Sequence, residues 1–208
     1  MPHFTNLFTY AIVVAVFVIV PGPSVLLTVA RSISSGTRAG LMTALGIAAG
    51  DVVHTTLAVL GVSAILMASA LAFAIMKYVG AAYLVYLGLK ALLQRSASLD
   101  LPSSERTFGK RAFTQGFLCE VLNPKSALFF LAFLPQFVDS AAGYPHVQLA
   151  VFGLLFIALG AISTCGYALA AAHVGSFLKK RSLLAKWQNK FIGGLYCALG
   201  VRLALQER

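Results

Sequence analysis

The sequence predicts an all-α, polytopic membrane protein with six transmembrane helices. The chain is 59% hydrophobic, and its mean hydropathy is +0.87. Charged residues make up 11% of it, against about 25% in soluble domains. One soluble core of this size could not bury so much apolar surface, whereas a bilayer solvates the outward faces of helices. Six segments are also long enough to cross, since a spanning helix needs about 20 mainly apolar residues.

The six predicted spans cover residues 6–30, 40–63, 64–93, 112–138, 147–173 and 184–205. The first span is interpreted as retained, because no Lys or Arg precedes it and no A-x-A cleavage motif follows it. The second and third spans are separated only by a tight turn expected within residues 63–69. The alternative is that one of these two segments re-enters without crossing, which would give five crossings.

The placement of basic residues favours six crossings. Lys and Arg lie in the first, third and fifth connections, and the second and fourth connections have none. The positive-inside rule then places the basic connections in the cytoplasm and both termini outside. The net charge of +10 therefore indicates orientation rather than nucleic-acid binding. The basic residues concerned are Arg31 and Arg38, then Arg95, Arg106, Lys110 and Arg111, then Lys179, Lys180, Arg181 and Lys186.

Residues 94–111 resemble a soluble loop and divide the chain into two halves. The whole chain, residues 1–208, is interpreted as one transmembrane domain with a cytoplasmic linker at 94–111. The half-repeats cover about 1–93 and 112–208. Because each half has three helices, the two halves are expected to have opposite orientations in the membrane.

The first predicted helix is interrupted by Pro21-Gly22-Pro23. Proline has no amide hydrogen, so Pro21 and Pro23 leave the carbonyls of Phe17 and Ile19 without their helical partners. Inside a bilayer such groups must be satisfied by protein, water or substrate.

The fourth predicted helix is interrupted at the corresponding place by Asn123-Pro124-Lys125, which frees the carbonyl of Glu120. Paired breaks in the two halves of an inverted repeat indicate a substrate site near the midplane. Half-helix N-termini attract a carboxylate and C-termini attract an ammonium, and an amino acid carries both groups. Simple proline kinks are the alternative.

Asp51 lies in the middle of the second span. A carboxylate there costs at least ~2.5–3.5 kcal/mol on insertion scales, and such residues are usually functional. His54 and Thr55 follow at i+3 and i+4 and share its side of the helix, and Gly46 and Gly50 form a face that permits close helix contact. A structural aspartate is the alternative.

Three other residues are site candidates. Glu120 could take up a proton or bind an ammonium group, or it could be a helix-end residue at the interface. Lys125 could neutralise a carboxylate, or it could be a cytoplasmic anchor. Tyr83 could line a cavity or pack at the interface.

Other chemistries have little support in the sequence. Cys119, Cys165 and Cys197 are isolated, so no metal, redox pair or cofactor is predicted. The motifs G-x-S-x-G, H-E-x-x-H and the Walker loop are missing from the sequence, which argues against an enzyme or an ATP-driven pump. A cation or metal-ion exporter remains an alternative, although its candidate ligands are few: Asp51, Glu120 and His54.

The order and spacing of several motifs resemble the LysE/RhtB family of bacterial amino acid exporters, which includes threonine, homoserine and leucine efflux proteins. The resemblance covers nearly the whole chain. The matching pieces are P-G-P at 21–23, S-S-G-T-R-A-G at 34–40, G-I-A-A-G-D at 46–51, K-Y-V-G-A-A-Y-L at 77–84, residues 113–116, N-P-K at 123–125, and F-F-L-A-F-L-P-Q-F at 129–137.

This resemblance implies export of amino acids or close derivatives, driven by the proton motive force. The protein is expected in the bacterial cytoplasmic (inner) membrane. Neutral amino acids, homoserine or homoserine lactone are the favoured substrates, with a basic amino acid as the alternative. Alternating access around the paired breaks is the expected mechanism, with Asp51 and Glu120 in proton coupling. Glu120 departs from the Asn more usual at its position. Expected partners are the amino acid, protons and the lipid bilayer, without nucleic acid, and the small-residue faces are compatible with a homodimer. The predicted substrate-binding residues are Pro21, Gly22, Pro23, Asp51, Tyr83, Glu120, Asn123, Pro124 and Lys125.

Overall fold

The described part of this computed structural model is entirely helical. It comprises residues 4–62, 70–93, 109–139 and 141–178, together with 194, 197–198, 201 and 204–205 near the C-terminus. The predicted turn at 63–69, nearly all of the linker at 94–111 and most of the sixth predicted span lie outside the described residues. No strand occurs within the described ranges, which agrees with the predicted all-α class.

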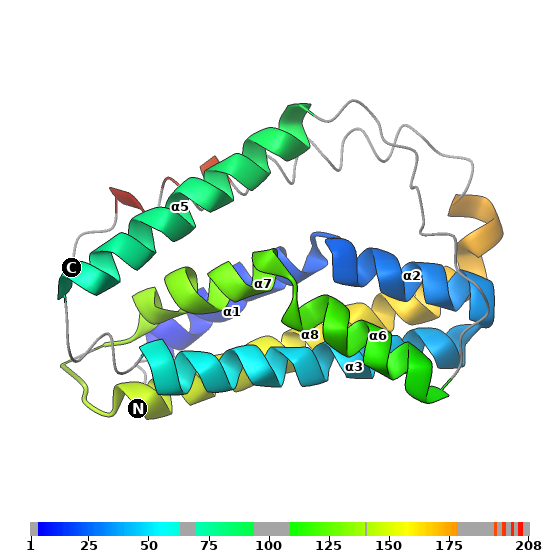
Figure 1. The fold of residues 1–208 in the computed structure, drawn as a ribbon, viewed down its shortest axis with the longest axis horizontal. Helices are drawn as coiled ribbons and strands as arrows, with labels where there is room; N and C mark the ends of the chain where they lie inside the picture. Colours follow the sequence, from blue (N-terminus) through cyan, green and yellow to red (C-terminus); the bar gives the residue numbers. More distant parts are fainter. Residues whose placement is uncertain are drawn as a thin grey trace.

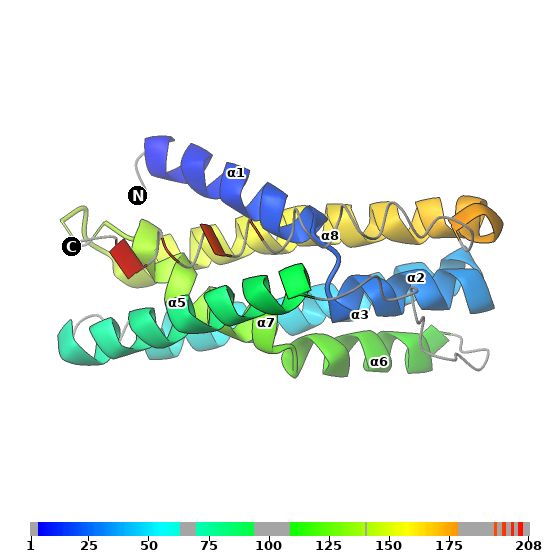
Figure 2. The same cartoon turned by 90° about the horizontal axis from the view of Figure 1, so that it is seen from above.

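The long helices run roughly along one common axis (Figures 1 and 2). The long helices are α1 Phe4–Ile19, α2 Pro23–Ser35, α3 Thr37–Leu57 with a π-helical turn Ala58–Val62, α5 Ala70–Leu93, α6 Gly109–Val121 and α8 Pro145–Leu178, and α7 Pro124–Leu128 is a short helix of 5 residues. After α7 the chain continues through a π-helical turn, Phe129–Phe133, and a 3₁₀ turn, Leu134–Phe137. The helix α5 lies along one side of the other helices (Figure 1) and contacts the turn Phe129–Phe133.

Two helices are long and apolar enough to cross a membrane singly, Thr37–Gly61 and Pro145–Ala171. Two bent pairs meet the same criterion together: the chain bends by 51° between α1 and α2, and by 45° between α6 and the segment that begins with α7. The described residues thus contain two candidate spans, or up to four if each bent pair is one span.

The first connection differs from the prediction. Arg31 was expected in a loop, but it lies in α2 and is buried, and Arg38 lies in α3. The link between the helices is Gly36 alone, whose φ of 87° suits glycine because it has no Cβ. The helix therefore continues past residue 30 to Ser35, where the Gly36 N–H closes the last turn on Ser32 O at 3.1 Å.

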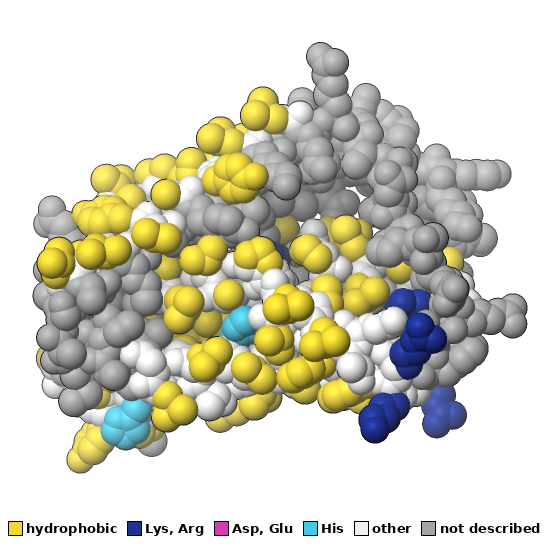
Figure 3. Space-filling view, viewed as in Figure 1, with side chains coloured by type: hydrophobic (Ala, Val, Ile, Leu, Met, Phe, Trp, Pro, Cys, Tyr) yellow, Lys and Arg dark blue, Asp and Glu magenta, His cyan; other side chains and the backbone are white. Residues whose placement is uncertain are grey.

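Exposed basic side chains gather at one end of the molecule (Figure 3). Arg38 at the start of α3, and Lys110 and Arg111 at the start of α6, contribute to this end and are exposed. The start of α1 lies toward the opposite end (Figure 1).

A cluster of buried aromatic rings fills the space between α1, the turns after α7 and the first half of α8. The Phe17 and Phe129 ring centroids are 4.4 Å apart, and those of Tyr10 and Phe152 are 4.7 Å apart. The buried members are Tyr10, Phe17, Phe129, Phe130, Phe133, Phe152 and Phe156.

The helices α3 and α6 are in close backbone contact. A Cβ added at Gly46 would overlap the backbone carbonyl of Phe113, and one added at Gly116 would overlap the carbonyl of Thr43. At Gly50 a Cβ would lie 2.6 Å from Glu120 Cβ. The predicted close-contact face of Gly46 and Gly50 is confirmed, and α6 is the helix that packs on it.

Candidate functional site

The chain is interrupted between Ile19 and Pro23, and the freed carbonyls at the end of α1 are all satisfied by side chains. Lys125 Nζ donates to the carbonyl oxygens of Phe17 at 3.3 Å and Val20 at 3.1 Å. Ser163 Oγ donates to Val18 O at 2.9 Å, and the Tyr167 hydroxyl donates to Ile19 O at 2.6 Å. Every one of these donors comes from the second half of the sequence.

The second interruption lies between Val121 and Pro124. The freed carbonyl of Glu120 accepts from the backbone N–H of Asn123 at 2.9 Å and lies 2.9 Å from His54 Nε2. Asn123 caps α7, because its Oδ1 accepts from the Lys125 N–H at 3.1 Å. The His54 ring stacks on Phe130 with centroids 5.6 Å apart. Each break is therefore closed by a side chain from the other half of the chain.

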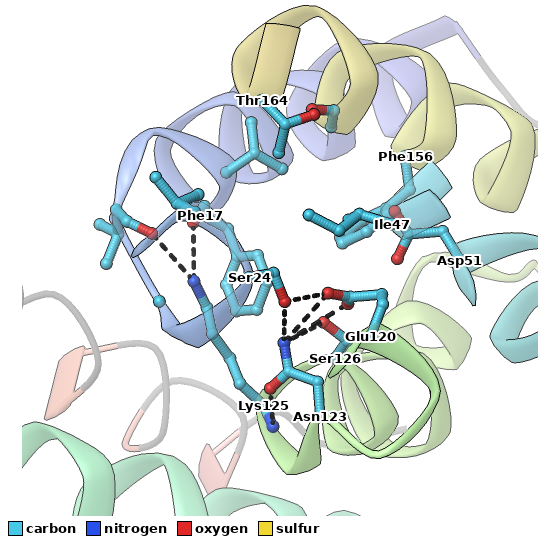
Figure 4. A pocket seen from close by; sticks show the side chains of 15 residues that line it. Phe17, Ser24, Ile47, Asp51, Glu120, Asn123, Lys125, Ser126, Phe156 and Thr164 are labelled. Carbon is cyan, nitrogen blue, oxygen red and sulfur yellow. Dashed lines mark hydrogen bonds between the residues drawn. The ribbon is translucent and has the colours of Figure 1, made fainter. Parts of the chain in front are cut away.

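A polar cluster joins the two breaks (Figure 4). Ser24 Oγ donates to Glu120 Oε2, and Asn123 Nδ2 donates to Ser24 Oγ at 3.1 Å. The same amide lies 3.3 and 3.4 Å from the Glu120 carboxyl oxygens and 3.2 Å from Ser126 Oγ. Glu120 thus accepts hydrogen bonds from two side chains, those of Ser24 and Asn123.

Asp51 faces the same space from α3 (Figure 4). Its side chain is 3% exposed, and its Oδ1 has no hydrogen-bond partner. An unpaired, buried carboxyl oxygen is costly, with a penalty of at least ~1–3 kcal/mol. Such an atom is a candidate for binding a proton or a cationic group.

A cavity lies between the two breaks. Its volume is about 50 Å³, which is enough to hold water. Its charged lining residues among those described are Asp51, Glu120 and Lys125. The remaining lining residues include small or hydroxyl-bearing ones, namely Gly22, Ser24, Ser126, Gly160 and Thr164, and apolar ones, namely Phe17, Val18, Val20, Val25, Ile47 and Phe156.

The structure brings most of the predicted site residues to this cavity. Gly22, Asp51, Glu120, Asn123 and Lys125 line it. The prolines at 21, 23 and 124 lie in the adjoining breaks but not in the lining. The side chain of Tyr83 lies outside the described part of α5.

Sequence reasoning missed several lining residues. The lining residues Ser24, Ser126, Phe156, Gly160 and Thr164 were not among the predicted site residues. Two of these residues could have been found from their place beside the breaks: Ser24 directly follows Pro23, and Ser126 lies two residues after Pro124. Gly160 and Thr164 carry no local sign of their role.

Comparison with known proteins decides the family. The model of the LysE type translocator family matches residues 15–207. The chain belongs to the LysE type translocator family. The family resemblance predicted from the motifs is thereby confirmed. The family consists of transporters rather than enzymes, so the translocator is a membrane protein that moves a solute.

Relatives of this translocator are similar over almost their whole length. A leucine efflux protein of Salmonella typhimurium is 33% identical over 204 residues, which is 96% of this chain and 94% of that protein. An uncharacterized membrane protein of Pseudomonas aeruginosa is 32% identical over 207 residues, 96% and 95% of the two chains. One from Vibrio cholerae is 30% identical over 195 residues, 94% of each. No solved structure matches the chain.

The donating amide of Asn123 yields a stability prediction for the translocator. Asn123→Asp keeps the oxygen that caps α7 but replaces the donor beside Glu120 with a second carboxyl oxygen. We expect the free energy of unfolding to fall by ~1–3 kcal/mol, measured by thermal unfolding in detergent. Asn6→Asp is the control, because it makes the same chemical change at an amide whose hydrogen bond is long, 3.5 Å to Phe137 O. Loss of that donor should cost less. Equal stability of the two variants would show that the Asn123 amide does not hold the cluster together.

Proposed function

We propose that the chain is a secondary active exporter of neutral, mainly apolar amino acids, driven by protons through alternating access. One observation carries the proposal: the cavity between the breaks presents unused groups for both ends of an amino acid zwitterion. The rest of its lining is largely apolar.

The carboxylate of the substrate is assigned to the N-terminus of α2. This helix has 13 residues, and no side chain caps its N-terminus. Its first-turn N–H groups and the positive end of its dipole therefore remain available to an anion. Gly22, Ser24 and Val25 bring this helix end to the cavity wall.

The ammonium group of the substrate is assigned to the carboxyl side of the cavity. Asp51 Oδ1 has no hydrogen-bond partner, whereas Glu120 already accepts from Ser24 and Asn123. The open acceptor is thus on Asp51. A charged hydrogen bond from the ammonium would relieve the cost of leaving that oxygen unpaired.

The side chain of the substrate would lie against Val18, Val25, Ile47 and Phe156, which favours an aliphatic group. The Salmonella typhimurium relative named as a leucine efflux protein supports the same class. Leucine is therefore the first compound to test.

Proton coupling is assigned to Asp51, together with Glu120. Two carboxyl groups and one ammonium line the cavity, so one additional proton brings the net charge of these three groups to zero. Glu120 has donors and Asp51 Oδ1 has none, which favours Asp51 as the group that takes up and releases the proton. Closing the cavity away from water costs less free energy when its charges sum to zero than when it carries a net charge.

The inverted-repeat architecture remains part of the proposal. We assign the bent pairs α1–α2 and α6–α7 to corresponding places in half-repeats at about 1–93 and 112–208, giving six crossings. The basic end formed by Arg38, Lys110 and Arg111 would lie on the cytoplasmic side of a bacterial inner membrane. The aromatic cluster would then close the cavity on the outer side, and a rocking of the halves would open it.

The test is efflux from cells and from proteoliposomes preloaded with leucine. We expect the protein to accelerate leucine efflux, and an uncoupler to reduce the driven component. Homoserine and its lactone belong in the same panel. If no amino acid moves but a divalent cation does, the rival function of metal-ion export replaces the proposal.

A further inference from the structure

The ammonium group of Lys125 lies at the C-terminal end of α1. Its Nζ donates to Phe17 O and Val20 O at 3.3 and 3.1 Å and lies 4.2 Å from the centroid of the Phe17 ring. Carbonyls at a helix C-terminus and the face of an aromatic ring both attract a cation. These groups form an ammonium site, and the chain itself fills it.

The neighbouring acceptors of this site are also in use. Val18 O already accepts from Ser163, and Ile19 O accepts from Tyr167. The four carbonyls of residues 17–20 therefore each accept a hydrogen bond from a side chain. A second cation entering here would have to displace Lys125.

The break leaves space for the stem of Lys125. A Cβ added at Gly22 would lie 3.4 Å from Lys125 Cδ and 3.6 Å from its Nζ. The lysine side chain thus crosses from α7 directly beside the backbone of the first break (Figure 4). This packing fixes its ammonium between the end of α1 and the cavity that Asp51 and Glu120 line.

We propose that Lys125 is a resident amine that excludes amino acids with a second ammonium group, and so restricts the cavity to substrates with uncharged side chains. This inference rests on the proposed function and adds the residue that sets its charge selectivity. The α-ammonium of the substrate is left to Asp51, because the other cation position is occupied. A side-chain ammonium would meet both the filled site and the like charge of Lys125.

The first test uses the unaltered protein in proteoliposomes. Leucine transport is measured with free L-lysine or free L-norleucine as competitor. We expect norleucine to compete and lysine to do so at least about tenfold more weakly, because two like charges in one desolvated cavity repel strongly. Equal competition by the two compounds would overturn the inference while leaving the proposed function intact.

The second test removes the resident amine. In Lys125→Ala we expect leucine transport to fall, lysine to become a competitor and a transported substrate, and added butylammonium to restore part of the leucine transport. A merely structural role would not produce the change in lysine selectivity or the rescue by an amine. Lys125→Arg, which keeps the positive charge, is expected to go on excluding lysine.

Lys110→Ala is the matched control, because Lys110 is an exposed lysine at the start of α6. It should change neither the selectivity nor the response to butylammonium. A folded Lys125→Ala protein that still excludes lysine overturns the inference. If that variant does not fold, the competition in the unaltered protein decides. If the unaltered protein moves no neutral amino acid, the proposed function itself fails.

Discussion

Asp51→Asn is expected to uncouple export from the proton gradient. The substitution keeps the size of the side chain but removes the group that binds and releases the proton. It also removes the charge that would hold the substrate ammonium, and charged hydrogen bonds contribute ~1.5–3 kcal/mol. Leucine efflux driven by a pH gradient should therefore fall by about 10–100-fold. The measurement compares proteoliposomes with and without an imposed gradient.

Two controls make this result specific. Asp139→Asn changes an acid at the end of the 3₁₀ turn, away from the cavity lining, and retains an oxygen at the position that accepts from the Ala141 N–H at 2.9 Å. It should export normally. The amount of Asp51→Asn protein in the membrane should equal that of the unaltered protein. Normal gradient-driven export by Asp51→Asn would mean that this carboxyl is structural and that the coupling scheme is wrong.

Gly116→Ala is expected to destabilise the folded protein severely. A Cβ at this position would overlap the backbone carbonyl of Thr43 on α3, and backbone cannot move aside as a flexible side chain can. Overpacking of a core typically costs ~1–3 kcal/mol, and here the helices must separate along the wall that carries both Asp51 and Glu120. We expect a lower thermal midpoint in detergent and less protein in the membrane.

Gly166→Ala is the matched control for this prediction. It makes the same chemical change within α8, at a position where an added Cβ meets nothing within 4 Å. Alanine also favours a helix by about 1 kcal/mol over glycine, so the control should be as stable as the unaltered protein or more so. Equal midpoints for the two variants would show that α3 and α6 are not held in the close contact described.

The sequence predicted which backbone carbonyls lack a helical hydrogen bond. It did not predict which side chains donate to them. Pro21, Pro23 and Pro124 identify the freed carbonyls because proline removes a specific hydrogen bond. The donors Ser163 and Tyr167 carry no such sign. They lie 145 and 148 positions away in the sequence from the carbonyls that accept their hydrogen bonds, and hydroxyl residues are ordinary in helices.

The site residues show the same division. Asp51 and Glu120 could be singled out because a carboxyl group in an apolar segment is costly and therefore rarely incidental. Which of them has hydrogen-bond donors depends on how α2, α3 and α6 are packed, and that packing is not written in local sequence. Gly46 and Gly50 indicated a close contact, but nothing in their spacing identified Gly116 as part of the opposing surface.

Arg31 shows how a correct rule gives a wrong boundary. Basic residues mark the end of the molecule on which the first connection lies, and a loop was therefore expected around Arg31. The single residue Gly36 suffices to connect α2 to α3, so the helix extends beyond the arginine and buries it. Charge patterns indicate sidedness, whereas the capping glycine determines where the helix ends.

The hydrogen bonds to the end of α1 have a consequence for how this chain can be divided. A fragment that stopped before residue 94 would carry the first break without Lys125, Ser163 and Tyr167. Four carbonyl oxygens would then lack their donors within lipid, so this half should be degraded when made alone. Supplying residues 94–208 as a separate polypeptide should rescue it, and the two pieces should be recovered together.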